Sequence, residues 1–208
     1  MKIFFDLDGT LIDVSKRYYF VHKKAALVIG KKSLSFKEYW QKKRKKIPEN
    51  KILNIDSESS QFKEYQKIRI NLLENLDYLS LDTPFENVFD TLVALTKKHK
   101  LYLITLRRNE KNLNTQLKQL KLNKFFIKIF SSPPDKDLTI TKIKIIKNLG
   151  YSKNDLIIGD TEADTEAAKK LGIRSVAVFS GIRTESFLKK YHPDILIKDV
   201  SHLLKIHL

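Results

Sequence analysis

Apolar residues follow two different rhythms along the chain. In residues 1–13 and from about residue 84 onward, short apolar runs that predict buried strands alternate with stretches of helical periodicity. Such alternation is typical of an α/β fold, in which helices cover both faces of a parallel sheet. The strands are expected at 2–7, 101–105, 125–130, 155–160, 175–179 and 194–197, and the helices between them at 84–98, 110–120, 142–149 and 162–171.

Between about residues 14 and 81 the pattern is helical throughout. Apolar residues recur every three or four positions from Tyr18 to Ile29, a second helix is expected to begin near Ser35, and a third is expected over residues 60–75. The stretch contains no convincing strand, so it is interpreted as a helical insertion after the first strand. The predicted organisation is therefore a core of residues 1–13 and 84–208, with a small helical domain over residues 14–83.

The composition is that of a globular protein. Of the 208 residues, 42% are hydrophobic and 31% are charged, which suffices for one α/β domain with a small accessory domain. No apolar run approaches the roughly 18 residues that span a membrane, and the first residues do not resemble a signal peptide. There are no cysteines, so disulfides and thiolate metal sites are excluded. We expect a cytoplasmic protein without membrane association.

The net charge of +16 raises the question of a polyanionic partner such as nucleic acid. Arginine, the usual reader of phosphate forks and base edges, contributes only 7 of the 40 basic residues. Abundant Ile, Lys and Asn are what an A+T-rich genome gives by codon bias, and the basic run 42–46 is interpreted as a solvated helix face. Nucleic-acid binding or processing through the basic insertion therefore remains an alternative that is not favoured.

Polar residues stand at the ends of several predicted strands. The first strand ends in Asp6 and Asp8, the strand 101–105 ends in Thr105, and the strand 155–160 ends in Asp160, with Asp164 one helical turn further on. Since ligands of open parallel sheets bind at the carboxyl ends of the strands, these side chains are expected at one edge. A lysine, either Lys142 or Lys136, precedes the Asp160 segment.

These residue types suit phosphoryl transfer. Carboxylates of Asp6 and Asp160, with the backbone carbonyl of Asp8, offer the oxygen ligands that Mg²⁺ takes. With its charge balanced, Asp6 is expected to attack phosphorus as a nucleophile, and Asp8 to exchange protons with the leaving alcohol and the attacking water. Thr105 and the lysine are expected to hold the phosphate oxygens. The predicted phosphate-binding residues are Thr105, Leu106 and Lys142.

Three motifs resemble the haloacid dehalogenase superfamily. They are FFDLDGTLID at residues 4–13, Thr105 after an apolar strand, and IIGDTEAD at residues 157–164. The segment AAKKLGIRSVAVFSG that follows is similar to the phosphoglycolate-phosphatase-like branch. The resemblance implies a Rossmann-like core with an α-helical cap inserted after the first motif. It also implies Mg²⁺ bound by Asp6, the Asp8 carbonyl and Asp160, with Asp164 orienting that shell.

The resemblance leaves the phosphate-binding lysine open between two positions. Lys136 keeps the family's spacing to Gly150, although Asp137 stands where proline usually follows. Lys142 is favoured because it begins an apolar helical pattern, with Thr141 as a possible N-cap.

The presence of Asp8 favours a phosphatase over a dehalogenase, since halide displacement needs no proton donor for a leaving alcohol. The expected activity is Mg²⁺-dependent hydrolysis of a small phosphate monoester through an aspartyl-phosphate. A sugar-phosphate mutase of the same superfamily is the alternative. The substrate and the oligomeric state are not fixed by the sequence.

Overall fold

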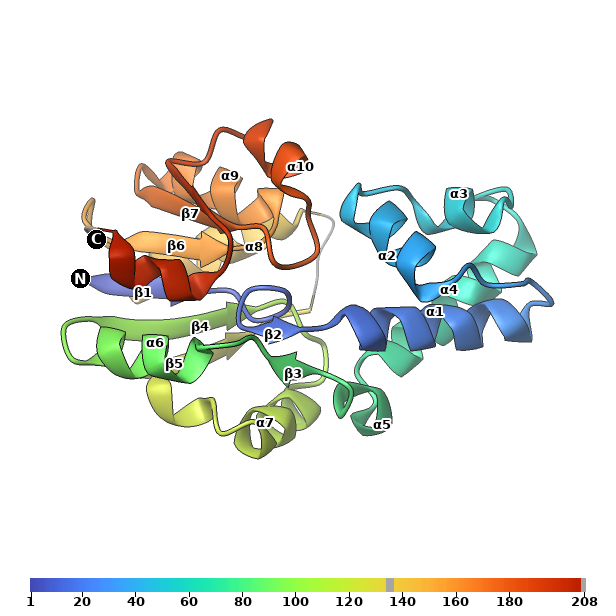
Figure 1. Cartoon of the computed structure of the whole chain (residues 1–208), viewed down its shortest axis with the longest axis horizontal. Helices are drawn as coiled ribbons and strands as arrows, with labels where there is room; N and C mark the ends of the chain where they lie inside the picture. Colours follow the sequence, from blue (N-terminus) through green and yellow to red (C-terminus); the bar gives the residue numbers. More distant parts are fainter. Residues whose placement is uncertain (134–136, 207–208) are drawn as a thin grey trace.

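The centre of the molecule is a six-stranded parallel sheet. In spatial order its strands are β5 (Lys128–Ser131), β4 (Lys100–Thr105), β1 (Lys2–Phe5), β6 (Leu156–Gly159), β7 (Arg174–Val178) and β8 (Ile195–Ile197). The computed structural model describes residues 1–133 and 137–206. Figure 1 shows β1, β4 and β6 lying side by side, so the predicted parallel sheet is confirmed.

Side chains alternate between the two faces of the sheet, as the pleat requires. Ile3 and Phe5 of β1 join one apolar cluster, and Phe4 joins another on the opposite face. The first face is covered by α6 (Val88–Thr96), α7 (Glu110–Gln119) and the 3-10 helix η2 (Val200–Lys205), and the second by α8 (Leu138–Leu149) and α9 (Glu162–Leu171). The core therefore has the three layers expected of a Rossmann-like fold.

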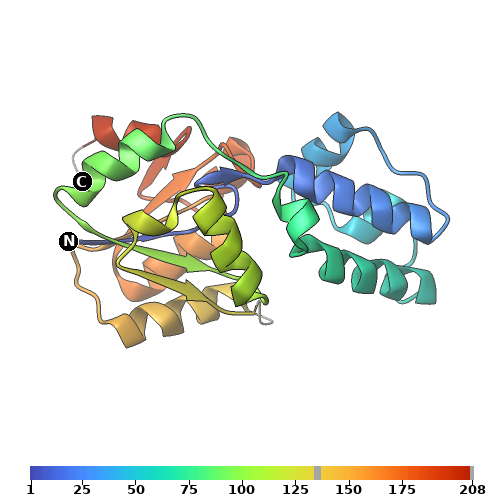
Figure 2. The same ribbon diagram turned by 90° about the horizontal axis from the view of Figure 1, so that it is seen from below.

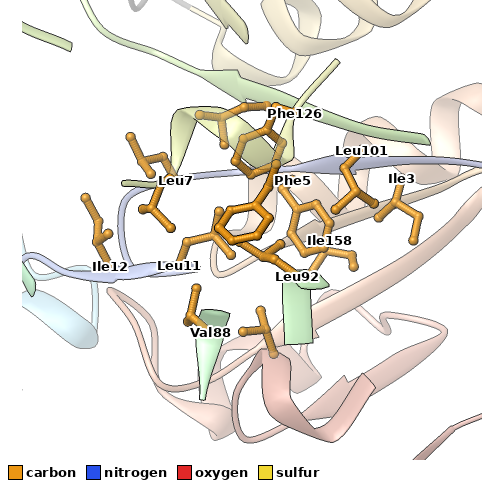
Figure 3. Close-up of a cluster of buried hydrophobic side chains, with 14 of the residues drawn as sticks. Ile3, Phe5, Leu7, Leu11, Ile12, Val88, Leu92, Leu101, Phe126 and Ile158 are labelled. Carbon is orange, nitrogen blue, oxygen red and sulfur yellow. The ribbon is translucent and has the colours of Figure 1, made fainter. Parts of the chain in front are cut away.

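The larger apolar cluster anchors the first strand. Figure 3 shows Phe5 at its centre, between Leu92 of α6 and Phe126. The rings of Phe5 and Phe126 meet edge to face with centroids 6.2 Å apart, and Phe5 is fully buried. Burying a side chain of this size stabilises the fold by about 1.5–3 kcal/mol, so the residues just before Asp6 are firmly held.

Five helices form a group at one end of the molecule, which we name the helical insertion. They are α1 (Ser15–Val28), α2 (Phe36–Arg44), α3 (Glu49–Leu53), α4 (Ser60–Leu73) and α5 (Leu76–Leu79). Figures 1 and 2 show this group beyond the carboxyl ends of the strands. It has an apolar core of its own, in which Ala25 of α1 packs with Phe62 and Tyr65 of α4.

The chain enters and leaves the helical insertion through a small ribbon. The two-residue strands β2 (Ile12–Asp13) and β3 (Thr83–Pro84) pair antiparallel, with Ile12 opposite Pro84. Figure 1 shows this ribbon between the sheet and the helices. The predicted division at residues 14–83 stays a prediction, and the ribbon lies at its two limits.

Several elements begin later or earlier than predicted. Helix α6 begins at Val88 rather than residue 84 because Pro84 belongs to β3. Helix α8 begins at Leu138, four residues before the predicted start, because the Asp137 side chain accepts a hydrogen bond from the Ile140 N–H and caps it. The elements not predicted are β2, β3, α3, α5, the 3-10 helix η1 (Asn123–Phe125), α10 (Glu185–Lys189) and η2. Within the described residues, no helix is long and apolar enough to cross a bilayer.

Candidate active site

Three carboxylates meet at the carboxyl end of the sheet. Asp6 follows β1, Asp160 follows the neighbouring strand β6, and Asp164 lies in the first turn of α9. One carboxylate oxygen from each residue lies within 4.8 Å of the others, and each residue is less than a tenth exposed. The predicted gathering of these residues at one edge is what the sheet geometry produces.

Lys142 lies among these carboxylates. Its ammonium group is 2.8 Å from Asp6 Oδ1 and also donates a hydrogen bond to Asp164 Oδ1. The lysine is buried and comes from α8, which covers the adjacent face of the sheet. The alternative lysine, Lys136, lies outside the described residues.

Glycines allow the acidic groups to approach so closely. A Cβ on Gly159 would lie 2.0 Å from Asp164 Cγ, and one on Gly9 would lie 2.1 Å from Asp160 Oδ2. Gly9 also has a φ of +82°, a conformation that other residues rarely adopt. The turn after the first strand is therefore shaped around the carboxylates of the neighbouring segment.

The cluster carries more acid than its own cation can balance. Burial raises the pKa of Asp6 to about 7; the Lys142 ammonium opposes that rise, and Asp164 and Asp8 add to it. Burial and the proximity of Asp6 also raise the pKa of Asp160 well above its ordinary value. A set of carboxylate oxygens whose mutual repulsion is unrelieved fits a hard divalent cation.

Asp8 lies in a different electrostatic setting from Asp6. Arg107 donates to both of its carboxylate oxygens, from Nε at 2.9 Å and from Nη2 at 2.5 Å. Arg17 of α1 approaches the same carboxylate, with Nη2 at 3.0 Å from Oδ2. Burial alone would raise the pKa of Asp8, but these two guanidinium groups lower it to about 2.

A cavity of about 420 Å³ opens over these groups. Asp6, Asp8 and Lys142 lie in its wall on the side of the sheet, together with Thr105 at the end of β4. The helical insertion supplies the opposite wall, which contains both apolar and basic side chains. The residues of the helical insertion in this wall include Tyr18, Arg69, Ile70 and Leu73, and Leu106 lines the cavity next to Thr105.

Of the predicted residues, Asp6, Asp8, Thr105, Leu106 and Lys142 line this cavity, and Asp160 and Asp164 lie beside Asp6 without lining it. Other residues of the site were not predicted. Arg107, two residues after Thr105, is buried against Asp8. Arg17 and its partner Asp82 were not predicted. Arg17 stands four residues before Val21, on the buried face of α1, and that position in the stripe was the available signal. Nothing in the sequence links Arg17 to Asp82.

The interpretation of residues 42–46 as a solvated face is wrong for part of that run. Arg44 donates hydrogen bonds to the backbone carbonyls of Phe179 and Arg183, and Lys46 pairs with Glu162 at 2.7 Å. The Thr184 N–H donates in turn to the Arg44 carbonyl. Basic side chains in this run therefore join the helical insertion to the core, Arg44 to the loop after β7 and Lys46 to the first residue of α9.

Comparison with known proteins defines the class. Residues 3–178 match the family described as haloacid dehalogenase-like hydrolase, and the chain belongs to this family. It is 25% identical over 216 residues to pyrophosphatase PpaX of Oceanobacillus iheyensis, a match that covers 98% of this chain and 95% of that protein. The predicted family and the prediction of an enzyme are confirmed.

Solved structures agree with this class at the level of the fold. A haloacid dehalogenase-like family hydrolase from Streptococcus pneumoniae matches with a TM-score of 0.82 at 24% identity, over 98% of this chain and 96% of that chain. A predicted phosphoglycolate phosphatase from Haemophilus somnus 129PT matches with a TM-score of 0.74 at 20% identity, over 98% and 96%. Each of these two matches covers the sheet and the helical insertion of this chain.

Proposed function

We propose that the protein is a Mg²⁺-dependent phosphohydrolase in which Asp6 is the nucleophile and Asp8 the general acid and base. The observation that carries this proposal is the position of the Asp6 carboxylate. It lies in the cavity wall, bound to Lys142 and crowded by Asp160 and Asp164. Such crowding is costly in a structural site and useful where a cation and a phosphate bind.

The oxygen-rich donor set fits Mg²⁺. Asp6, Asp160 and the Asp8 carbonyl would hold the ion, with Asp164 orienting that set from its position in the first turn of α9. When bound, the ion neutralises the repulsion between a carboxylate and a phosphate dianion. Thr105, Leu106 and Lys142 would hold the phosphate oxygens, because all three line the cavity.

The chain's own groups then carry the two half-reactions. An oxygen of Asp6 forms a bond to phosphorus as the bond to the leaving oxygen breaks, and Asp8 gives that oxygen a proton. Water next attacks the phosphorus, the bond to Asp6 breaks, and Asp8 takes the proton of the water. The negative charge of the bound phosphoryl group disfavours the ionised form of Asp8 and so favours the protonated form that the first step needs.

The substrate class follows from the cavity and the relatives. A volume of about 420 Å³ suits a small phosphorylated molecule. The curated relative is a pyrophosphatase and one structural neighbour is a predicted phosphoglycolate phosphatase, so pyrophosphate and phosphoglycolate are the first compounds to test. The helical insertion, which forms one wall, would act as the cap that selects among such substrates.

The test measures phosphate release from pyrophosphate, phosphoglycolate and 4-nitrophenyl phosphate, with Mg²⁺ and with EDTA. Asp6→Asn keeps the shape of the side chain and removes its nucleophilic charge, so turnover is expected to fall by at least about a thousandfold. Asp90→Asn is the matched control, because Asp90 is an exposed carboxylate on α6. If wild type releases no phosphate from any ester or anhydride in Mg²⁺, the proposal fails.

A sugar-phosphate mutase is the second candidate, since it shares the step in which Asp6 is phosphorylated. Hydrolysis and transfer are separated by their products. A hydrolase releases inorganic phosphate, whereas a mutase moves the phosphoryl group between hydroxyls of one sugar without net release. Nucleic-acid binding is tested by measuring how much DNA or RNA the protein retains as the salt concentration rises. If the high lysine content reflects codon bias alone, this binding should be weak and nonspecific.

A further inference from the structure

Arg17 joins three segments of the chain through one buried guanidinium group. Its Nε donates to Asp82 Oδ1 at 3.0 Å, its Nη1 donates to the Leu73 carbonyl at 3.0 Å, and its Nη2 lies 3.0 Å from Asp8 Oδ2. The residue is 1% exposed. Because the guanidinium fork is rigid, these three contacts fix the end of α4, the segment before β3 and Asp8 relative to one another.

The far side of this group is closed by a second layer of polar side chains. Asp82 is 2% exposed and lies outside the lining of the cavity. Its second carboxylate oxygen accepts a hydrogen bond from Gln116 Nε2 at 2.7 Å, and Gln116 Oε1 lies 3.4 Å from Arg107 Nη2. Carboxylates and guanidinium groups thus alternate from Asp8 through Arg17 to Asp82, and Arg107 completes the circuit back to Asp8.

A purely structural role accounts poorly for this arrangement. The other residues on the same face of α1, such as Val21 and Ala25, are apolar, and an apolar side chain at position 17 would avoid the cost of burying a charge. Arg107 already contacts both oxygens of Asp8. The Arg17 Nη2 group is close enough to Asp8 for an ion pair but has no hydrogen bond of good alignment, which is unfavourable for a buried donor.

We infer that Arg17, backed by Asp82, is a positioning residue for Asp8: from the first helix of the insertion it holds the Asp8 carboxylate in its working place. The inference rests on the proposed role of Asp8 as general acid and base. It has a consequence for the helical insertion. Since Arg17 and Leu73 belong to its helices, Asp8 is correctly placed only while the insertion is docked on the sheet as it is here.

The leaving group provides a readout that a structural role does not move. A good leaving group such as 4-nitrophenolate needs little protonation, whereas an alkoxide needs a placed proton donor. In Arg17→Met, kcat is therefore expected to fall about 10- to 100-fold for alkyl phosphates and less than about fivefold for 4-nitrophenyl phosphate. Across a series of substituted phenyl and alkyl phosphates, the plot of log kcat against leaving-group pKa becomes steeper than in wild type.

Two further variants separate positioning from binding and from folding. Asp82→Asn is expected to give the same steepening, because Asp82 holds the Arg17 guanidinium at 3.0 Å and lies farther from that of Arg107, at 3.9 Å. The double variant should therefore be little worse than Arg17→Met. Arg17→Lys keeps the charge without the fork and should recover part of the loss. Arg69→Met is the matched cap arginine: it lines the same cavity without contacting Asp8, so it should affect all esters by one common factor.

The positioning role is overturned if Arg17→Met and Asp82→Asn lower kcat equally for good and poor leaving groups. It is also overturned if the two substitutions change KM alone. If Arg17→Met does not fold, judged by circular dichroism and thermal unfolding, Asp82→Asn decides the matter by the same plot. If the wild type cleaves none of the esters in Mg²⁺, the proposed function fails. If the wild type is active but the variants show the same slope of log kcat against leaving-group pKa, only the positioning role of Arg17 fails.

Discussion

The molecule contains two buried polar clusters, one with an excess of carboxylates and the other with an excess of hydrogen-bond donors and cations. At the end of the sheet, the carboxylates of Asp6, Asp160 and Asp164 surround the single ammonium of Lys142. Inside the helical insertion, the single carboxylate of Glu49 is surrounded by donors. Tyr39 donates to it at 3.1 Å, Tyr65 at 2.9 Å and Lys43 at 2.9 Å. His22 lies 3.2 Å from the same carboxylate and forms an ion pair with it when the imidazole is protonated.

The two clusters shift their carboxyl groups in opposite directions. Burial and like charges raise the pKa values of Asp6 and Asp160, whereas at Glu49 burial is outweighed by Lys43, His22 and Arg69, which lower the pKa well below its ordinary value. A cluster with surplus acid is incomplete without another cation. In a cluster with surplus donors the buried carboxylate is fully compensated and needs no further cation, so the cluster supports the fold rather than the chemistry.

The largest expected effect comes from completing the acidic cluster. Adding Mg²⁺ to EDTA-treated wild type should raise the Tm, since a ligand at a thousand times its Kd adds about 4.1 kcal/mol. Asp160→Asn should abolish that rise. Its own Tm in EDTA should equal or exceed that of wild type, because one of three repelling carboxylates has been neutralised. Scanning calorimetry measures both, and an undiminished Mg²⁺ response in the variant would contradict the comparison.

The Glu49 cluster should respond in the opposite way. Glu49→Gln removes the acceptor charge and leaves buried donors partly unsatisfied, so the free energy of unfolding should fall by about 2–4 kcal/mol at pH 7. The Mg²⁺-induced rise in Tm should remain, because Glu49 lies outside the acidic cluster. Urea unfolding measures the loss, and an unchanged stability would mean that the donors are satisfied without the charge.

The pH dependence of that loss has a defined sign. Since the pKa of Glu49 is lowered on folding, the unfolded state binds more protons at acidic pH, and the stabilisation is present above the unfolded pKa of about 4.3. It is lost as pH falls through the lower folded value. The stability difference between wild type and Glu49→Gln should therefore shrink as the pH falls below about 4.3, and it should vanish below the folded pKa, where Glu49 is protonated in both states and resembles Gln.

The smallest expected effect lies at the surface contact between the insertion and the core. Lys46 is 52% exposed at its side chain, and its partner Glu162 keeps Arg183 at 2.8 Å when Lys46 is removed. Lys46→Ala should change the free energy of unfolding by less than about 0.5 kcal/mol. If Lys46→Ala lowered the free energy of unfolding as much as Glu49→Gln does, exposed and buried polar contacts would stabilise the fold equally, which contradicts the comparison.

The sequence predicted the sheet and the acidic residues for one physical reason. Parallel strands bring their carboxyl ends to one edge, so Asp6, Thr105 and Asp160 could be grouped from their positions alone. The helix that carries Lys142 was predicted too short, because Asp137 was considered only as a substitute for proline and not as an N-cap.

Contacts between distant segments carry no such periodic signal. Arg17 and Asp82 are 65 positions apart, and each is a charged residue that single-sequence reasoning assigns to the surface. The helix of Glu49–Leu53 and the strand of Ile12–Asp13 are shorter than the stretches of about 11–18 and 4–8 residues over which helical and strand patterns can be recognised. Burial of Glu49 likewise depends on partners from three other segments.

The ribbon of β2 and β3 gives the architecture a modular character. Asp13 and Thr83 are paired, so the chain departs from the sheet and comes back at adjacent points. The order of the sheet strands places no demand on the length or identity of what is inserted there. We expect that substituting the intervening helices by those of a relative, spliced at Asp13 and Thr83, exchanges substrate preference as a unit while Asp6, Asp160 and Asp164 stay in place. The new helices must then bring their own counterpart of Arg17 and Asp82 to Asp8.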